Sequence, residues 1–176
     1  WDTTQIYGYI NKENFEELFK QANKLEYKAT KQPLDNGEKS RMYGYPCWQT
    51  DIINQDSDIY NILFSTLESK FDLNIKKIKT YFRKIYTQEL RKSTCFANGT
   101  IKHIDDPIYK QAGVIYFDSK FLNDGTEFFE SFTSPEPTLI IGSMPNRAIL
   151  FDSQIPHRPG HSYHHECRLV QVFFIE

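Results

Sequence analysis

The second half of this chain consists of short segments of strand-forming residues, with no long helical pattern between them. The segments are rich in Ile, Val, Phe and Tyr, and residues such as Asn, Asp, Gly, Pro and Ser divide them. Strands are predicted at residues 78–88, 112–118, 126–131, 138–142, 146–152 and 167–175. Because helices do not alternate with these strands, the pattern disfavours a doubly wound parallel sheet. It favours a sandwich or a barrel, and in particular a jelly-roll barrel with helices packed on its outside.

The first part of the chain is predicted to be helix-rich. Apolar residues recur at helical spacing over residues 15–25, with Glu and Lys between them, and again over residues 57–72. Each predicted helix has two candidate N-caps, which are Asn11 or Asn14 for the first helix and Asp56 or Ser57 for the second. The fold class is therefore mainly β with N-terminal helices, an α+β arrangement.

Length and charge restrict the possible organisation and partners. The 176 residues suit a single domain, residues 1–176, in which a helix-rich part at 1–75 packs on a β core at 76–176. The net charge of −2 provides no basic surface for phosphates, so no nucleic-acid partner is expected. No apolar run approaches the roughly 20 residues of a membrane-spanning helix, and no secretion signal is visible, so no membrane association is expected.

The cysteines indicate a reducing environment. Cys47, Cys95 and Cys167 are odd in number and far apart, which fits neither a disulfide framework nor a CxxC metal knuckle. We interpret them as free thiols and predict a cytoplasmic location.

The tripeptide His103-Ile104-Asp105 offers two metal-ligating side chains. In an extended segment, residues two apart project to the same side, so His103 and Asp105 can reach one point while Ile104 packs the other way. One imidazole and one carboxylate make half of a metal site. Such tripeptides are common, and the alternative interpretation is a turn that leads into Asp106-Pro107.

A candidate third ligand follows a predicted buried strand about fifty residues later. His157 comes soon after the strand at 146–152, which would place its imidazole at the mouth of a barrel. His161, His164 and His165 follow in a loop with Gly and Ser, where we expect them to be solvated, and the whole run is alternatively a surface cluster. We therefore prefer His157 to His161. Two histidines and one carboxylate leave open positions on a metal, as in non-haem Fe(II) oxygenases.

Arg168 stands at the start of the last predicted strand, where alternation places it on the same face as Val170 and Phe174. A buried guanidinium among apolar side chains is costly unless it is paired, and the sequence offers only Glu166 or Asp152 nearby. A ligand with a carboxylate would offset this cost, because the planar guanidinium binds a carboxylate through two parallel hydrogen bonds. The alternative is an arginine at the strand end that reaches solvent.

The order of these elements resembles the Fe(II)/2-oxoglutarate-dependent dioxygenase superfamily, and within it the prolyl-4-hydroxylase-like branch. The local sequence agrees over His103-Ile104-Asp105-Asp106-Pro107, Ala112-Gly113-Val114-Ile115-Tyr116-Phe117-Asp118 and Gly125-Thr126-Glu127-Phe128-Phe129. Asp124 replaces the first Gly of the family's Gly-Gly-Thr-x-Phe turn, and Phe117-Asp118 replaces Leu-Asn. The resemblance covers roughly residues 78–175.

The resemblance implies a double-stranded β-helix, a jelly-roll or cupin-like barrel, and a role for each site residue. His103, Asp105 and His157 match the iron ligands. Arg168 matches the basic residue that binds the distal carboxylate of 2-oxoglutarate, where many prolyl hydroxylases have Lys. Tyr116 matches a tyrosine that donates a hydrogen bond to the same cosubstrate, and its alternative role is a core aromatic with a satisfied hydroxyl.

The implied activity is hydroxylation of a C–H bond with Fe(II), 2-oxoglutarate and O₂, with release of succinate and CO₂ and with ascorbate as a candidate reductant. The substrate would be a small molecule or a peptide, such as a peptidyl prolyl residue, with a rim at residues 31–50 and 119–136. A non-catalytic cupin-like barrel that binds a metal or a small acid is the main alternative, and a zinc hydrolase is another. Arg168 argues against both, because neither requires a buried arginine beside the metal.

Overall fold

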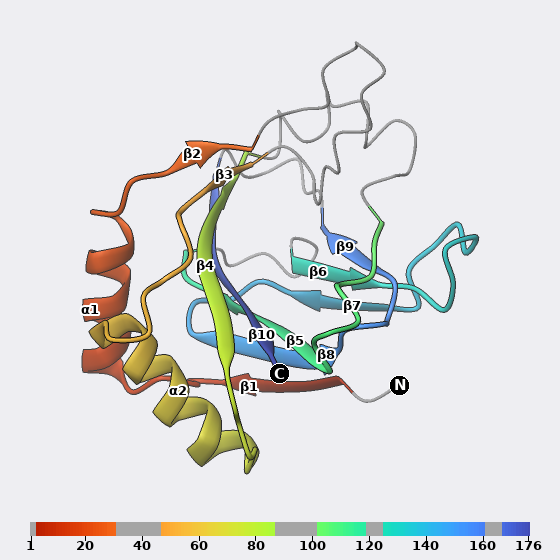
Figure 1. The fold of residues 1–176 in the computed structure, drawn as a ribbon. Helices are drawn as coiled ribbons and strands as arrows, with labels where there is room; N and C mark the ends of the chain where they lie inside the picture. The colour runs from red at the N-terminus through yellow and green to blue at the C-terminus, as the bar shows by residue number, and fades with distance from the viewer. Residues whose placement is uncertain (1–2, 31–46, 87–101, 119–124, 161–166) are drawn as a thin grey trace.

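The computed structural model describes residues 3–30, 47–86, 102–118, 125–160 and 167–176 (Figure 1). Within these ranges the protein has two helices and two β-sheets. The elements in chain order are β1 (Thr3–Tyr7), α1 (Lys12–Ala22), β2 (Lys28–Ala29), β3 (Trp48–Gln49), α2 (Asp58–Phe71), β4 (Ile78–Ile85), β5 (Gln111–Tyr116), β6 (Gly125–Phe128), β7 (Leu139–Gly142), β8 (Arg147–Asp152), β9 (His157–Pro159) and β10 (Arg168–Ile175).

The strands form a large and a small antiparallel sheet. The seven-stranded sheet has the order β1-β8-β5-β10-β4-β3-β2, and the three-stranded sheet has the order β7-β6-β9. Buried residues of both sheets share one apolar cluster, so the sheets face each other as Figure 1 shows. The mainly β prediction is confirmed. The described strands pair only within their own sheet, so this part of the chain shows two opposed sheets of a jelly roll and no closed barrel.

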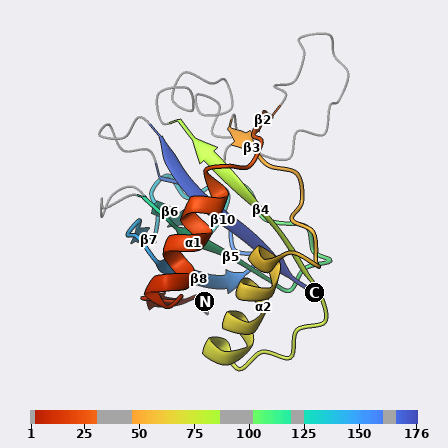
Figure 2. The same ribbon diagram turned by 90° about the vertical axis from the view of Figure 1, so that its left-hand side faces the viewer.

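Both predicted helices are present and cover one face of the large sheet (Figure 2). α1 follows Asn11, whose side chain accepts a hydrogen bond of 2.9 Å from the backbone N–H of Asn14. α2 follows Ser57, whose hydroxyl accepts one of 3.2 Å from the N–H of Tyr60. Of the two candidate caps for each helix, the structure thus selects Asn11 and Ser57. Neither helix of the described chain is long and apolar enough to cross a membrane.

The first part of the chain also contributes strands, which the prediction of a helix-rich layer missed. β1 pairs with β8 at one edge of the large sheet, and β2 and β3 extend the opposite edge beyond β4. β1 has five residues of mixed polarity, and β2 and β3 have two residues each, so none has a recognisable alternation. Residues from both predicted parts of the chain therefore share one sheet.

The large sheet has two different faces, which alternate along its central strand β10. Leu169 and Phe173 point to the helices and belong to the cluster that α1 and α2 complete. Val170 and Phe174 point to the small sheet. The outer face is tightly packed, since a Cβ at Gly113 of β5 would lie 2.1 Å from the ring of Phe173. Any larger residue than glycine at this position would displace that ring.

Two of the three cysteines lie in the described part of the chain, and both Cys47 and Cys167 are free thiols. Cys95 lies outside the described residues. The cytoplasmic location stays a prediction.

Candidate metal centre

Two short extended segments bring His103, Asp105 and His157 together between the sheets. His103 and His157 exchange backbone hydrogen bonds of 2.9 and 2.8 Å, and the N–H of Asp105 donates to the carbonyl of Ser153 at 2.9 Å. The segment with the HxD motif therefore runs along the turn that leads into β9. This pairing carries both imidazoles to the same side, with ring centroids 4.4 Å apart.

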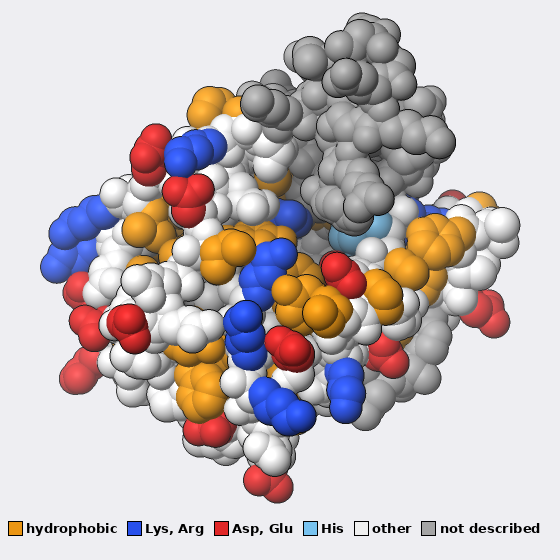
Figure 3. All heavy atoms as spheres, in the orientation of Figure 1, with side chains coloured by type: hydrophobic (Ala, Val, Ile, Leu, Met, Phe, Trp, Pro, Cys, Tyr) orange, Lys and Arg blue, Asp and Glu red, His pale blue; other side chains and the backbone are white. Residues whose placement is uncertain are grey.

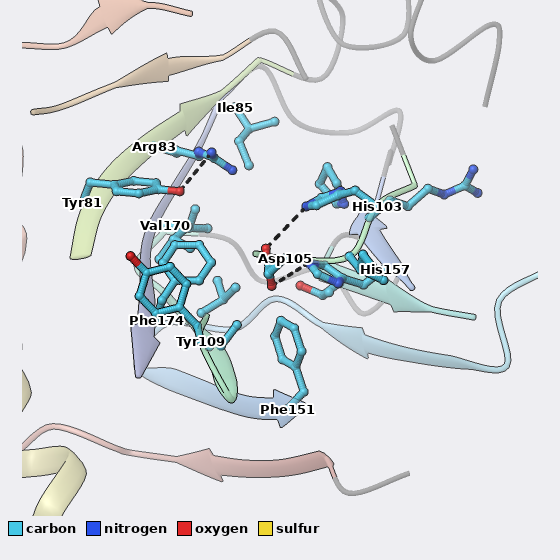
Figure 4. Close-up of a pocket in the computed structure, with 18 of the residues that line it drawn as sticks. Tyr81, Arg83, Ile85, His103, Asp105, Tyr109, Phe151, His157, Val170 and Phe174 are labelled. Atoms are coloured by element: carbon cyan, nitrogen blue, oxygen red, sulfur yellow. Dashed lines mark hydrogen bonds and ion pairs between the residues drawn. The ribbon is translucent and has the colours of Figure 1, made fainter. Parts of the chain in front are cut away.

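The ligating atoms of these three side chains converge. One such atom from each residue lies within 4.8 Å of the others. Nε2 of His103 is 4.0 Å from Oδ1 of Asp105, and Nε2 of His157 is 3.6 Å from Oδ2 of Asp105 (Figure 4). His103 has a side chain that is 29% exposed, whereas that of His157 is 9% exposed. A histidine side chain is accordingly visible from outside, beside the grey atoms in Figure 3.

The polar atoms of the cluster fit a divalent cation. Oδ2 of Asp105 is buried and has no hydrogen-bond partner among the described residues, which is costly for a carboxylate. Nδ1 of His157 lies 2.8 Å from the carbonyl of Ile155, which can only accept, so Nδ1 carries the proton. The lone pair of His157 is then on Nε2, the atom that faces Asp105. A ligating histidine is commonly oriented in this way by a hydrogen bond from its other ring nitrogen.

Burial shifts Asp105 and His157 toward their neutral forms. Desolvation raises the pKa of Asp105 to about 6, and the positive charges of His103 and Arg83 oppose this shift in part. Desolvation also lowers the pKa of His157 to about 4. At neutral pH His157 is therefore a neutral base and Asp105 a carboxylate in an unfavourable site. A cation bound between them would stabilise that carboxylate.

Arg168 and Tyr116 line a cavity of about 640 Å³ that also contains the three convergent side chains. Arg168 is 1% exposed and projects from β10 on the inner face, as the alternation predicts. Its Nη1 and Nη2 donate to the carbonyls of Gly125 and Gly160, at 3.3 and 3.1 Å. Asp152, a candidate partner in the sequence, is instead exposed and accepts a hydrogen bond from the N–H of Gln154.

Tyr116 projects from β5 into the same cavity. Its hydroxyl lies 2.7 Å from Oγ1 of Thr126, so the two hydroxyl groups share a buried hydrogen bond. The hydroxyl of Tyr116 therefore has a hydrogen-bond partner, and the side chain also lines the cavity. Both interpretations of Tyr116 are compatible with this position.

No protein-family model matches the sequence, and no curated protein matches it. Solved structures do match. A prolyl-4-hydroxylase from Pseudomonas putida has a TM-score of 0.61 and 13% identity, over 99% of this chain and 91% of that chain. An oxidoreductase of the 2OG-Fe(II) oxygenase family from Burkholderia pseudomallei has a TM-score of 0.63 and 10% identity, over 99% and 84%. HygX from Streptomyces hygroscopicus, solved with nickel, 2-oxoglutarate and hygromycin B, has a TM-score of 0.60 and 11% identity, over 98% and 82%.

This chain has the fold of the 2OG-Fe(II) oxygenases. The likeness extends over almost the whole chain, including the N-terminal part that the sequence motifs did not cover. At these identities it concerns the fold, so the chemistry of the site has to be argued from the side chains.

One cavity residue of this oxygenase fold, Arg83, was missed by the sequence analysis. It lies on β4 and faces the cavity together with Tyr81 and Ile85. Its Nε donates to Oε1 of Gln49 at 2.9 Å, and its Nη2 donates to the hydroxyl of Tyr81 at 3.1 Å. The alternation that singles out Arg168 in the last strand places Arg83 on one face with Tyr81 and Ile85, so the signal was present.

Several sequence predictions for this oxygenase fold lie outside the described residues. These are His161, His164 and His165, the residue Glu166, the residue Asp124, most of the expected rim segment 31–50 (residues 31–46), and the first third of the expected rim segment 119–136 (residues 119–124). His157 is thus the histidine of its group that the structure shows beside His103 and Asp105.

Proposed function

We propose that this protein is an Fe(II)- and 2-oxoglutarate-dependent oxygenase that hydroxylates a C–H bond of its substrate and releases succinate and CO₂. The observation that carries the proposal is the presence of His103, Asp105 and His157 in the same cavity as the buried Arg168. A mixed nitrogen and oxygen ligand set suits iron, and three protein ligands leave positions for an organic cosubstrate and O₂.

The three ligands have distinct roles in this proposal. Asp105 supplies the negative charge, and its buried Oδ2 would gain the cation as a partner. The carbonyl of Ile155 fixes the ring of His157 with Nε2 facing Asp105, where this nitrogen would bind the metal. His103 is held by its backbone pairing with His157. The bound iron would supply the activation of O₂ that oxidises both cosubstrate and substrate.

Arg168 would bind the distal carboxylate of 2-oxoglutarate, with Tyr116 as a second donor. The carbonyls of Gly125 and Gly160 orient the guanidinium, so little side-chain freedom is lost when a carboxylate binds. The cavity of about 640 Å³ is within the range of pockets that hold drug-sized ligands, so it has room for a second compound beside a five-carbon diacid.

The primary substrate in this proposal is a peptidyl residue, such as a prolyl residue, or a small molecule. The similar structures include both a prolyl-4-hydroxylase and a protein solved with hygromycin B. O₂ is the oxidant and ascorbate is the candidate reductant, and we place the reaction in the cytoplasm. A cupin-like barrel that only binds a metal or a small acid is less well supported, because it has no need for Arg168 beside the metal.

Succinate formation from 2-oxoglutarate under air tests the proposal. We expect the metal-free protein to form succinate after addition of Fe(II) and ascorbate, and to stop when either Fe(II) or 2-oxoglutarate is omitted. The variant Asp105→Ala is the negative control. If the protein binds Fe(II) and 2-oxoglutarate but forms no succinate, the non-catalytic barrel is the better description. If it binds neither, the site assignment is wrong.

A further inference from the structure

We infer that the primary substrate presents an uncharged aromatic group, and that Tyr109 is a residue that determines specificity for it. The inference rests on the proposed function, because it concerns the part of the cavity that the metal and 2-oxoglutarate would leave open. It names a class of substrate and the end of the cavity at which this substrate binds.

The cavity has a polar end and an apolar end, which are separated along β10. The side chains of this strand that line the cavity are Arg168, Val170, Val172 and Phe174. At about 3.3 Å per residue, Arg168 and Phe174 lie roughly 20 Å apart along the strand. A five-carbon diacid bound at Arg168 is much shorter than this distance, so it would leave the end at Phe174 open.

The neighbouring strand β5 continues the same division. In its pairing with β10, Tyr116 is opposite Val170 and thus lies near Arg168. Further along both strands the lining is apolar and consists of Val114, Val172, Ala112 and Phe174. The groups that can bind a carboxylate are therefore gathered at one end, and the other end suits an apolar group.

Three aromatic side chains form a wall at the apolar end. The ring of Phe174 contacts those of Tyr81 and Tyr109, with centroid distances of 5.9 and 5.3 Å and interplanar angles of 43° and 40°. Tilted rings of this kind can accept a further ring in an offset or edge-to-face position. Figure 4 shows the wall on the side of the cavity opposite His103 and His157. An aromatic group bound against it would face the metal centre, where a substrate has to be placed for oxidation.

The backbone of Tyr109 is fixed relative to the metal centre. Its N–H donates to the carbonyl of Asp106 at 3.0 Å, and its carbonyl accepts a hydrogen bond from the hydroxyl of Ser153. The carbonyl of Ser153 accepts a hydrogen bond of 2.9 Å from the N–H of Asp105. Ser153 therefore connects the backbone of Asp105 with that of Tyr109, so the aromatic ring projects from a defined position beside the proposed ligands.

Apolar side chains also border the cavity at the surface of the protein. Ile104 and Pro107 line the cavity, and Ile104 is 39% exposed. Figure 3 shows hydrophobic side chains on the same face as the visible histidine. Within the described part of the chain, apolar surface is thus present both outside the cavity and on its wall, which fits the entry of an apolar group.

The charged side chains at this end do not favour a charged ligand. Nζ of Lys79 lies 5.9 Å from the ring centroids of Tyr109 and Phe174, so a cation already covers these rings and would repel another. Burial raises the pKa of Tyr109, and the negative charges of Asp106 and Glu176 raise it further. A carboxylate beside Tyr109 would therefore meet like charges, whereas an uncharged ring meets neither penalty.

Binding of small ring compounds to the full chain tests this inference. The protein is loaded with zinc in place of iron and with 2-oxoglutarate, so that no turnover occurs. The probes are benzyl alcohol, cyclohexylmethanol, benzylamine and benzoate, and ligand-observed NMR titration gives their dissociation constants. We expect benzyl alcohol to bind about 3- to 10-fold more tightly than cyclohexylmethanol, from the added stabilisation of aromatic pairs, and more tightly than either charged compound. Omission of 2-oxoglutarate should leave the dissociation constant of benzyl alcohol within about twofold, because the two compounds occupy different ends of the cavity.

Variants assign the aromatic preference to the wall. Tyr109→Leu should lower the preference for benzyl alcohol over cyclohexylmethanol, and the double variant Tyr109→Leu/Phe174→Leu should abolish it. Tyr109→Phe keeps the ring and should keep the preference, which separates the loss of an aromatic contact from misfolding. Tyr7→Leu is the matched control, because Tyr7 is 69% exposed on β1 and should leave the preference unchanged.

The inference is overturned if benzyl alcohol fails to bind, if cyclohexylmethanol or a charged compound binds as tightly, or if Tyr109→Leu leaves the preference unchanged. It is also overturned if 2-oxoglutarate displaces benzyl alcohol, since the apolar end would then hold the cosubstrate. Failure of the proposed function would instead appear as absence of succinate formation in the unmodified protein with Fe(II), whatever the titrations with ring compounds show.

Discussion

The two faces of the large sheet are built from the same strands and serve different purposes. On the outer face, Leu169 and Phe173 of β10 pack against residues of α1 and α2 in an apolar cluster. On the inner face, Arg168 and Val170 line a cavity that also holds Asp105. The outer face thus provides stability through close packing, whereas the inner face keeps polar groups in a partly empty space. The difference predicts that substitutions on the two faces will have separable effects.

The largest effect is expected in the cavity beside the inner face, at the three convergent side chains. His157→Ala, His103→Ala or Asp105→Ala should abolish iron-dependent succinate formation, because each removes one of the three proposed metal ligands. Circular dichroism of the metal-free variants should show that the fold is retained. Full activity in any one of the three variants would mean that the residue is not a ligand.

The next effect belongs to the outer face. Phe173→Ala should lower the free energy of unfolding by about 3–5 kcal/mol, the usual cost of removing a buried phenylalanine ring. Phe174→Ala on the inner face is the matched variant and should cost less than half as much, since Phe174 borders a cavity and Phe173 is fully enclosed. Urea denaturation of the metal-free protein measures both values. Equal losses in the free energy of unfolding for the two variants would contradict the proposed difference in packing between the two faces.

The buried carboxylate of Asp105 is expected to destabilise the folded protein when no metal is bound. The pKa of Asp105 is raised to about 6 in the folded metal-free protein. Ionisation of this carboxyl group therefore lowers the free energy of unfolding as the pH rises from about 4 to above 6. At pH 7, Asp105→Asn should therefore raise the free energy of unfolding by about 3 kcal/mol, at about 1.4 kcal/mol for each unit of the shift. The gain should shrink as the pH falls to 4.

The matched control for this prediction is Asp106→Asn at the exposed neighbouring position, which should change little. Thermal and urea unfolding in the presence of a chelator would measure the gain. A destabilised Asp105→Asn protein at pH 7 would show that the carboxylate is well accommodated without a cation.

The smallest effect is expected at Arg168 and should be specific to the cosubstrate. Arg168→Ala should raise the dissociation constant of 2-oxoglutarate about 10- to 100-fold, because a charge-assisted, bidentate contact is lost. The affinity for iron should remain nearly unchanged, and calorimetric titration can measure both affinities separately. An unchanged affinity for 2-oxoglutarate would place the carboxylate elsewhere in the cavity.

Sequence reasoning identified the parts of this structure that have strong local patterns. The six strands β4, β5, β6, β7, β8 and β10 have enough alternating or apolar residues to be found, and Asn11 and Ser57 are recognisable helix caps. The strands β2, β3 and β9 were missed because each has only two or three residues, and β1 was missed because its five residues have no recognisable alternation. All four pair with segments that are distant in the sequence. Tertiary pairing of this kind leaves little trace in local sequence.

The candidate site could be predicted in part for the same reason. His103 and Asp105 are related by the geometry of an extended segment, which is a local pattern. Their convergence with His157 depends on the backbone pairing of His103 with His157, and the family resemblance, not a local pattern, implied this ligand set. The hydrogen bond between Tyr116 and Thr126 and the contacts of Arg83 with Gln49 depend on how distant strands approach each other. No spacing in the sequence reports such contacts.

The most direct test of the central claim is a crystal structure of the protein with Fe(II) and the unreactive analogue N-oxalylglycine, prepared without oxygen. We predict one metal ion, about 2.0–2.2 Å from a ring nitrogen of His103, a ring nitrogen of His157 and an oxygen of Asp105. The distal carboxylate of the analogue should contact the guanidinium of Arg168. A metal bound away from these three residues, or an analogue that leaves Arg168 untouched, would contradict the account.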